Sequence, residues 1–485
     1  MKTCLSLLCL FSCFLATSQE RLGLGLENYA GVSGLSVNPA AHLSNPLSWD
    51  VNLAGAGSFF DNNYYFIKNT SALDLWKNRE DIEFDFAKDL KGPPPANTYL
   101  IEFFDDGRQR YFTLDTKIAG PSFVFKIKEN HSVGFFTNAR IVGGALKIPN
   151  EFSYYKYDLW PLNDPFNVSP FKGAIMAWTE MGLNYAIKIP DYSGYMGIGV
   201  SLKKLDGYEA AYAENLGNWV HTKLPDDVIS LRSANGKFGI TDSNLVEEGF
   251  AAQKNGSGFG IDIGFVKAVQ EYEDGYKWKF GAAVLDIGSI QFTKNAQAHR
   301  VHNASEFDLV LQDFERFKNV EMVDSLFLFF SGESLGSPTA SLVSNHFKLA
   351  LPTAIVLQAD YSFTKNLYVN GLFSHRLPMG GIGPQKASLL ALTPRFEHRW
   401  FSASLPVSLY NWQKVRIGFA ARLGFLVIGS DHLGSLFGQS DFTGTDLYFA
   451  LKINQLNLHL NLFGGGGNGN GRKHGPRKKV KCYTF

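Results

Sequence analysis

Long stretches in which every second residue is apolar are the sequence feature that most restricts the fold of this chain. Met181, Leu183 and Tyr185 alternate with the small or polar residues Gly182 and Asn184. The same alternation recurs at residues 196–203, 259–265, 401–409, 415–425 and 447–454. Successive side chains of a β-strand point to opposite faces of its sheet, so this pattern predicts many strands with one apolar face each.

Two architectures give this alternation, and they differ in which face of the sheet is inside. A soluble sandwich buries its apolar faces and uses strands of about 5–6 residues. A transmembrane barrel turns its apolar face to lipid and uses strands of about 9–11 residues. The alternating segments here are mostly long, and their other face carries Gly, Ala and Ser with scattered charges. The sequence therefore favours a transmembrane barrel, with a soluble sandwich as the alternative.

Composition removes two other classes of protein. The 485 residues include 41 Phe and 20 Tyr, whereas disordered chains are poor in aromatic residues. After residue 18 no run approaches the 18 apolar residues of a membrane-spanning helix. We predict an all-β, antiparallel transmembrane barrel over residues 49–463, with about 14 strands and a range of 12–16.

The N-terminus has the pattern of a signal peptide. Lys2 precedes an apolar core, and small residues at 16–18 offer a cleavage site, which predicts a signal peptide over residues 1–18. A lipoprotein signal ending at Cys13 is the alternative. Cleavage after residue 18 removes three of the four cysteines, so the mature chain keeps only Cys482 and no internal disulfide is expected. We therefore predict export to the outer membrane of a Gram-negative bacterium, with outer-membrane lipid as surroundings.

The C-terminal residues 464–485 form a Gly-rich linker followed by a basic tail. The six basic residues of the tail are Arg472, Lys473, Arg477, Lys478, Lys479 and Lys481. Without these six and Lys2, 39 basic residues remain against 45 acidic ones, a balance of about −6 that argues against nucleic acid as a partner. The tail has two interpretations, a solvated run or a site for anionic lipid headgroups or an acidic partner.

Segments that interrupt the alternation suggest additional elements. Residues 19–48 are rich in Gly and turn residues, as expected of an N-terminal hatch that enters the barrel lumen. Residues 71–92 predict a short helical excursion. The inserts 206–255 and 293–345 are too long for tight turns and are candidate contact sites for a protein partner. Within the second insert, apolar residues at helical spacing over 307–317 predict a helix.

Asn38-Pro39-Ala40, after a Gly-rich stretch, resembles the N-terminal signature of FadL-type and PorV-type outer-membrane barrels. The chain more closely resembles a family of Bacteroidota outer-membrane barrels of unknown function. The matching segments are 31–40, 50–64, 351–371, 422–431, 444–452 and the closing KVKCYTF. The resemblance implies outer-membrane location and a FadL-like architecture, and it implies neither a reaction nor a substrate.

Charged residues on the small-residue face of the predicted strands are the candidate lining of the lumen. Lys203, Arg416, Arg422 and Lys452 fall on this face, and so does Asp262. They pair with lumen carboxylates such as Asp262, are simply solvated, or form a polar lining that selects solutes.

One motif could indicate an enzyme. Residues 332–336 match the pattern G-x-S-x-G around Ser334, and Asp360 and His398 follow in the order of a hydrolase triad. Pro338 follows almost at once, however, and the chain lacks alternating strand and helix units. We therefore interpret the motif as a chance match and expect no enzyme.

The sequence predicts no cofactor or metal site. His299 and His302 form an H-x-x-H pair in a polar segment, which without a third ligand we interpret as two solvated histidines. The Gly runs at 380–383 and 464–471 do not follow a strand and open a helix, so they do not predict dinucleotide binding.

Three functions remain open. The first is a FadL-type barrel that passes hydrophobic or small solutes and binds a hydrophobic ligand in its lumen. The second is a non-conducting accessory barrel of an assembly or secretion machine, which binds a partner through residues 206–255, 293–345 or the tail. The third, a barrel enzyme, has only the Ser334 motif in its favour.

Overall fold

The computed structural model describes residues 22–80, 82–87, 92, 98–150, 160–242, 252–270, 275–314, 316–317, 323–438 and 440–455. The predicted signal peptide (1–18) and the predicted basic tail (464–485), with Cys482, lie outside the described residues. In the part of the chain that is described, no helix is long and apolar enough to cross a membrane.

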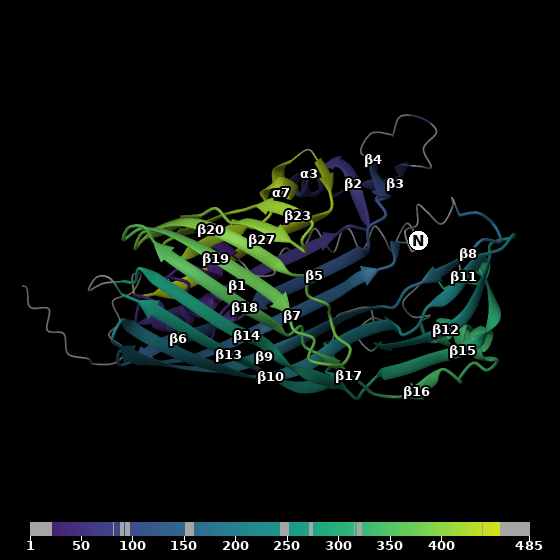
Figure 1. Ribbon diagram of the computed structural model, residues 1–485, viewed down its shortest axis with the longest axis horizontal. Coiled ribbons are helices and arrows are strands. Elements are labelled where there is room, and N and C mark those ends of the chain that lie inside the picture. The colour runs from purple at the N-terminus through teal and green to yellow at the C-terminus, as the bar shows by residue number, and fades with distance from the viewer. Residues whose placement is uncertain are drawn as a thin grey trace, which may run out of the picture.

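The described residues form a closed antiparallel barrel of fourteen strands, as the sequence predicts (Figure 1). In order around the barrel, the strands are β1 (Trp49–Asn62), β5 with β6 (Arg110–Ala119 and Ser122–Ile127), β7 (His131–Ile148), β9 (Phe171–Asp191), β10 (Gly194–Asn215), β13 (Gly256–Val269), β14 (Trp278–Phe292), β17 with β18 (Phe347–Ala350 and Ala354–Ser362), β19 (Leu367–Arg376), β20 (Leu389–Glu397), β21 with β22 (Phe401–Ser404 and Val407–Tyr410), β23 with β24 (Lys414–Ile417 and Phe419–Leu423), β25 (Leu426–Ser430) and β27 (Gly444–Asn454). Pairing of β1 with β27, from Asp50 opposite Asn454 to Asp61 opposite Gly444, closes the barrel.

The apolar faces of the barrel strands point outward. On β9, Met181 is 56% exposed and Leu183 is 64% exposed, whereas the alternate residue Asn184 is buried. On β13, Phe259 is 77% exposed while Asp262 is buried. This inside-out arrangement is the opposite of a sandwich core and typical of a barrel surrounded by lipid.

The two ends of the barrel have connections of different length. At one end, here the short-turn end, hairpins such as Tyr192–Ser193 and Gly424–Phe425 join the strands. Residue 49, where β1 begins, and residue 454, where β27 ends, also lie at this end. At the other end, the long-loop end, the connections are longer and carry further structure.

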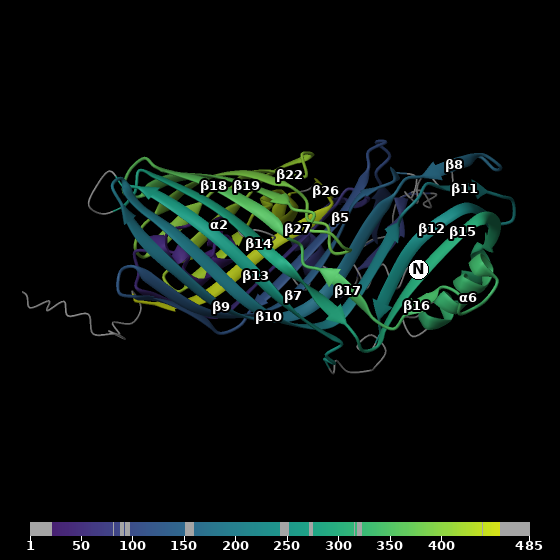
Figure 2. The ribbon, with the colours of Figure 1, turned by 60° about the horizontal axis from the view of Figure 1, so that its bottom comes forward.

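The long-loop end carries a sheet extension (Figure 2). It comprises β8 (Pro165–Val168), β11 (Trp219–Lys223), β12 (Val228–Thr241), β15 (Ala296–Val310) and β16 (Leu342–Ser344), with α5 (Leu311–Phe314) and α6 (Val323–Leu335). The inserts 206–255 and 293–345 therefore contribute strands to this extension, which is continuous with β10 through its pairing with β12. The helix predicted over 307–317 is wrong for its first part, because β15 continues to Val310 and only α5 follows.

A second, smaller sheet covers the long-loop end beside the extension (Figure 1). It contains β2 (Tyr65–Thr70), β3 (Glu83–Phe86), β4 (Thr98–Phe103) and β26 (Ser440–Phe442), and it packs with α3 (Ala72–Lys77) and α7 (Leu433–Phe437). Ile67, Leu75 and Phe442 lie in its core. The helix expected within 71–92 is thus α3, which begins after its N-cap Ser71.

The described part of the predicted hatch, residues 22–48, lies inside the barrel. It forms α2 (Leu22–Gly25) and the 3-10 helices η1 (Gly31–Ser36) and η2 (Ala41–Ser44). Figure 2 shows α2 enclosed by the strands. Leu22, Leu35, Val37, Ala40 and Leu43 are all buried, so the hatch fills the lumen at the short-turn end.

Candidate functional site: the hatch and the chamber above it

Asn38-Pro39-Ala40 fixes the hatch to the barrel wall through backbone and amide hydrogen bonds. The side chain of Asn38 donates to the carbonyl of Phe265 over 3.0 Å, and its oxygen accepts from the amide of Ala40 over 2.9 Å. From the wall, the Asn184 amide donates to the carbonyl of Pro39 over 3.0 Å. The motif that sequence comparison singled out is therefore a contact point between hatch and barrel.

Glycines in the wall make room for this motif. A Cβ on Gly199 of β10 would lie 2.5 Å from the amide nitrogen of Ala40, and one on Gly264 of β13 would lie 2.2 Å from the Asn38 side-chain oxygen. Both distances are shorter than any tolerated contact of a Cβ atom. The small-residue face of these strands is thus a surface on which the hatch backbone lies directly.

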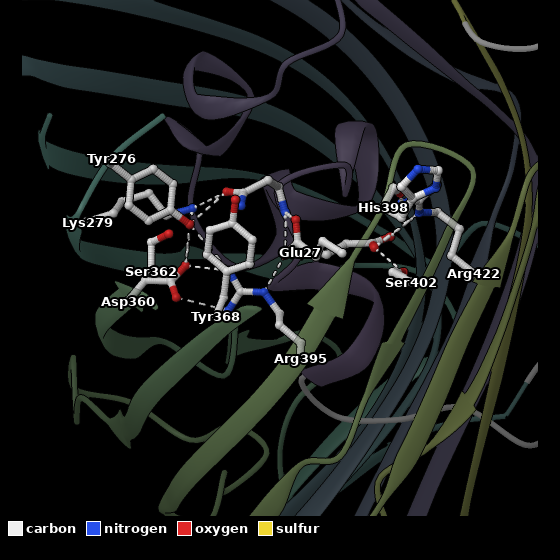
Figure 3. Close-up of polar contacts among 12 residues, drawn as sticks. Glu27, Tyr276, Lys279, Asp360, Ser362, Tyr368, Arg395, His398, Ser402 and Arg422 are labelled. Atoms are coloured by element: carbon white, nitrogen blue, oxygen red, sulfur yellow. Dashed lines mark hydrogen bonds and ion pairs between the residues drawn. The ribbon is translucent and has the colours of Figure 1, made fainter. Parts of the chain in front are cut away.

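Glu27 of the hatch makes a buried ion pair with the wall (Figure 3). Its carboxylate accepts from Arg422 Nε at 3.1 Å to each oxygen and from the Ser402 hydroxyl at 2.5 Å. The remaining nitrogens of Arg422 donate to the carbonyls of His398 and Arg399. Both charged side chains are about 2–3% exposed, so loss of either partner leaves a buried, uncompensated charge.

Asn28, the next hatch residue, contacts a second part of the wall. Its backbone amide donates to both carboxylate oxygens of Glu397 over 3.2 Å. Its side-chain oxygen accepts from the Lys279 ammonium over 2.8 Å and lies 2.9 Å from the Tyr276 hydroxyl. Three wall residues thus converge on one hatch residue.

The wall residues around Asn28 belong to a buried charge network. Arg395 donates to both oxygens of Asp360 at 3.0 and 2.5 Å and to Glu397 at 2.5 Å (Figure 3). Tyr276 donates to Asp360 over 2.8 Å. Together with the Glu27 pair, this network is a lock that holds hatch residues 27–28 against the short-turn end of the barrel.

Lys452 makes a third connection between hatch and wall. Its ammonium donates to the carbonyl of Ala30 and lies 3.5 Å from Asp50. Asp50 in turn accepts from the backbone amide of Val32 over 3.0 Å. A carboxylate and an ammonium of the barrel wall therefore both form hydrogen bonds with the hatch backbone.

His42, in η2 of the hatch, is 1% exposed. Burial and the nearby Lys126 ammonium lower the pKa of the His42 imidazole to about 3. The ring is therefore neutral inside the hatch at ordinary pH, and protonating it works against the packed arrangement.

A polar cavity of about 80 Å³, here called the chamber, lies on the other side of the hatch. Hatch residues 32–33 and 35–36 line one side of it. Its charged lining residues are Asp115, Lys117, Arg140, Glu180, Lys203, Asp262, Asp286 and Lys386, four of each sign. The predicted lumen residues Lys203 and Asp262 thus face this chamber, 2.7 Å apart.

A bulge in β14 shapes the charged wall of the chamber. Asp286 has a left-handed backbone with φ of +56°, opposite the point where the register of β13 shifts between Ile261 and Ile263. The bulge brings the Asp286 carboxylate to 3.0 Å from Arg140 and 2.5 Å from Lys203. A strict alternation could not have predicted this side chain in the lumen.

The loop over residues 377–388 closes the other side of the chamber. It leaves β19 and returns into β20, and yet the amide of Gln385 donates to the carbonyl of Gly144 on β7 over 3.1 Å. Strands β7 and β20 are the third and tenth of fourteen around the barrel, so they face each other across the lumen. The loop therefore crosses the lumen, and Lys386 from it lines the chamber.

Arg416 and Arg422, the other predicted lumen residues, are also buried. Arg416 pairs with Asp61 at 2.7 Å, and its guanidinium lies 4.0 Å from the ring centre of Tyr410. This pair lies apart from the chamber lining, near the long-loop end of β1 and β23. The structure thus separates the predicted lumen residues into chamber, hatch lock and a distant pair.

The residues of the possible hydrolase triad do not come together. Ser334 lies in α6, and its hydroxyl donates to the carbonyl of Phe330 one turn earlier over 2.6 Å. Asp360 belongs to the barrel wall and pairs with Arg395, while the carbonyl of His398 binds Arg422. The geometry of a nucleophile elbow is absent from these residues.

The interpretation of His299 as a solvated residue is wrong. His299 is buried, stacks on Phe238 with ring centres 4.9 Å apart, and bonds Ser341 over 3.0 Å through Nδ1. Phe327 of α6 packs on the same ring. His302, in contrast, is exposed, so the pair is divided between the core of the extension and its surface.

A family model described as "Family of unknown function (DUF5723)" matches residues 39–431. Among curated proteins, no sequence matches this chain.

Several solved barrels are similar in arrangement. The toluene transporter TbuX of Ralstonia pickettii has a TM-score of 0.39 at 11% identity, covering 91% of this chain and 99% of that one. The deltaS2S3 mutant of TodX, a monoaromatic hydrocarbon channel, has 0.41 at 9%, covering 87% and 94%. A Pseudomonas aeruginosa FadL homologue has 0.24 at 9%, covering 87% and 92%. Such low scores carry no functional argument, and the fold rests on the strand pairing itself.

Proposed function

The chain belongs to this family of unknown function, and we propose that it is a gated outer-membrane pore for small polar solutes, with the hatch as its gate. The outward-facing apolar belt supports a place in a membrane, and the contrast of short turns and long loops is typical of bacterial outer-membrane barrels. The short-turn end, where the hatch enters, then faces the periplasm.

The chamber is the observation that carries this proposal. A hydrophobic solute there would separate charged groups from water without replacing their hydrogen bonds, which is costly. Eight charged side chains line this space, with signs in balance. Of the solutes that the sequence left open, hydrophobic or small, the chamber fits small polar or zwitterionic ones.

The hatch is suited to be a gate because, among the described residues, one peptide connection at Trp49 joins it to the wall and the remaining attachments are non-covalent. Its lock consists of paired charges and hydrogen bonds, which exchange with water once the segment moves. Its packing against Gly199 and Gly264 uses the backbone, so the wall keeps a smooth face when the hatch leaves.

Solute entry into liposomes that contain the full-length protein tests the proposal. Swelling rates would be compared for arabinose, glycine and a tetrasaccharide, with the wild type and with a variant lacking residues 22–46. We expect slow entry with the wild type, and fast entry of arabinose and glycine, but not of the tetrasaccharide, with the variant.

Heat-dependent migration on a gel would verify that the variant barrel is folded. Equal, slow entry of all three solutes with a folded hatch-less barrel would contradict the proposal.

The extension favours the second candidate function, an accessory barrel that binds a protein partner. Its edge strand β16 exposes Leu342 by 41% and Val343 by 61%, and unpaired strand edges are sites where another chain can add. Co-purification of a stoichiometric partner that is lost on removing residues 313–345 would support this function, and the contribution of the basic tail stays a prediction.

A further inference from the structure

A second cavity, here called the outer cleft, opens on the far side of the loop that closes the chamber. It measures about 150 Å³ and lies where the chain leaves β19 for residues 377–388. Gln385 lines the outer cleft and its neighbour Lys386 lines the chamber, so one turn of backbone separates the two spaces. Its lining also includes Thr353 and the glycines 380, 381 and 383.

The charges of the outer cleft have one sign. Lys172, at the start of β9, and Arg376, at the end of β19, are its charged lining residues, and no carboxylate of the described residues lines it. Both lie on the lumen face of their strands. Lys172 is two residues from buried Ala174 on β9, and Arg376 is two residues from buried Ser374 on β19. Both are half-buried. The outer cleft is thus a cationic recess at the mouth of the barrel.

Neither cationic side chain has a partner among the described residues: no side-chain hydrogen bond or ion pair joins the Lys172 ammonium or the Arg376 guanidinium to another described residue. Glu214, the cross-strand neighbour of Lys172, lies outside the cleft lining and makes no ion pair with it. Half-burial removes part of the water around the Arg376 guanidinium, and no carboxylate of the described residues pairs with it in place of that water.

Other inward-facing cations of this barrel are treated differently. Arg140, Lys203, Arg395 and Arg422 each lie within 3.1 Å of a carboxylate oxygen. These four cations are each neutralised by a carboxylate, whereas the two cations of the outer cleft are not. The missing counter-charge is what a ligand would supply.

The backbone of the recess is also open to a ligand. Gly380 and Gly381 have φ of +79° and +82°, a left-handed conformation that glycine adopts without strain. A Cβ at either position would meet no atom within 4 Å, so both glycines border open space. A ligand can therefore reach the main chain of this loop as well as the two cations.

We propose that the outer cleft binds the oxyanion group, a carboxylate or a phosphate, of a solute before the solute enters the chamber. The planar guanidinium of Arg376 matches two oxygens of such a group, and the Lys172 ammonium adds a point charge. The cleft then determines the class of solute, and the balanced chamber accepts the remainder of the molecule. Its role in transport rests on the proposed function, but the binding itself does not.

Calorimetric titration of the full-length protein in detergent, at constant ionic strength, tests the site with inorganic phosphate as the probe. We expect saturable binding that Arg376→Gln weakens at least tenfold and Lys172→Gln several-fold. Arg376→Lys should retain part of the affinity, because it keeps the positive charge. It should lose the rest, because a lysine ammonium lacks the planar group that binds two oxygens at once. Lys365→Gln, a cation at the short-turn end, should bind as the wild type does.

A second titration with short-chain phosphatidic acid in mixed micelles identifies the source of the oxyanion. Phosphate that competes with this lipid indicates a free solute at the site. Lipid binding that depends on Arg376 and resists phosphate indicates a lipid headgroup. In either case the site is an oxyanion site.

Absence of saturable binding of both probes, or binding that Arg376→Gln and Lys172→Gln leave unchanged in folded barrels, would overturn the inference. The proposed function fails separately: binding without solute entry into liposomes removes the pore and keeps the site. Entry of glycine without any oxyanion binding would contradict the proposed oxyanion site and support the proposed pore.

Discussion

The hatch lock and the outer cleft place cations in the same lumen under opposite conditions. In the lock, Arg422 and Arg395 are buried and each has a carboxylate partner, Glu27 and Asp360. In the outer cleft, Arg376 is half-buried and has no partner among the described residues. Paired charges give a fixed, closed arrangement, whereas an unpaired charge is open to a ligand. The paired charges thus suit closure of the lumen at the short-turn end, and the unpaired ones suit binding of a ligand at the long-loop end.

The largest effect should follow from breaking the lock. Arg422→Met leaves the Glu27 carboxylate buried without its cation, so we expect the free energy of unfolding to fall by about 3–5 kcal/mol. Denaturant unfolding in detergent, monitored by tryptophan fluorescence, measures this loss. The double variant Glu27→Gln with Arg422→Met should recover most of it, because the uncompensated carboxylate is gone. A loss below 1 kcal/mol would mean that the lock does not hold the hatch.

A smaller effect should follow from filling the wall beneath the hatch motif. Gly199→Ala places a methyl group 2.5 Å from the Ala40 amide, so the hatch must shift, at a cost of about 1–3 kcal/mol. Glycine entry into liposomes should rise with the same variant. In Gly371→Ala the new methyl group has its nearest contact at 3.8 Å, and this variant should behave as the wild type. Equal behaviour of both variants would place the hatch backbone away from this wall.

The buried His42 should make the closed end sensitive to acid. Because burial depresses its pKa from 6.5 to about 3, the folded state resists protonation, and its stability is complete above pH 6.5 and falls as the pH drops toward 3. Between pH 7.5 and 5.5 we expect a loss of about 1 kcal/mol from this group. His42→Gln should remove this part of the pH dependence, and the exposed His302→Gln should not. An unchanged pH profile in His42→Gln would show that the ring is not buried as described.

The smallest effect is expected at the residue with the most conspicuous sequence motif. Ser334→Ala removes a hydroxyl that bonds within its own helix, so we expect a loss of about 1 kcal/mol or less and unchanged solute entry. Thermal unfolding and the liposome assay check both quantities. Loss of a hydrolytic activity on substitution would contradict our assignment of this serine to structure.

Local alternation was enough to predict the barrel and the orientation of its strands. Because the side-chain period of a strand is two, Met181 and Asn184 can be assigned to opposite faces from the sequence alone. The count of about 14 strands and the hatch over 19–48 followed from the same pattern and its interruptions. Lys203 and Asp262 could be placed on the lumen face for this reason.

Pairings between distant residues could not be predicted in this way. Glu27 and Arg422 are 395 positions apart, and nothing local indicates that they meet. Asp286 enters the chamber through a bulge that breaks the alternation, and residues 377–388 look like an ordinary Gly-rich loop until Gln385 is found against Gly144. The extension was missed because its strands lie inside inserts whose irregular ends masked the pattern. Closure of the barrel, not local preference, determines each of these contacts.

Charge reversal across the Glu27–Arg422 pair tests most directly whether the hatch is a gate. Glycine entry into liposomes would be measured with the wild type, Glu27→Arg, Arg422→Glu and the variant that carries both changes. We expect slow entry with the wild type, fast entry with each single reversal, and a return toward slow entry when both reversals restore the pair. Equally slow entry with all four folded barrels would contradict the claim that this lock closes a passage.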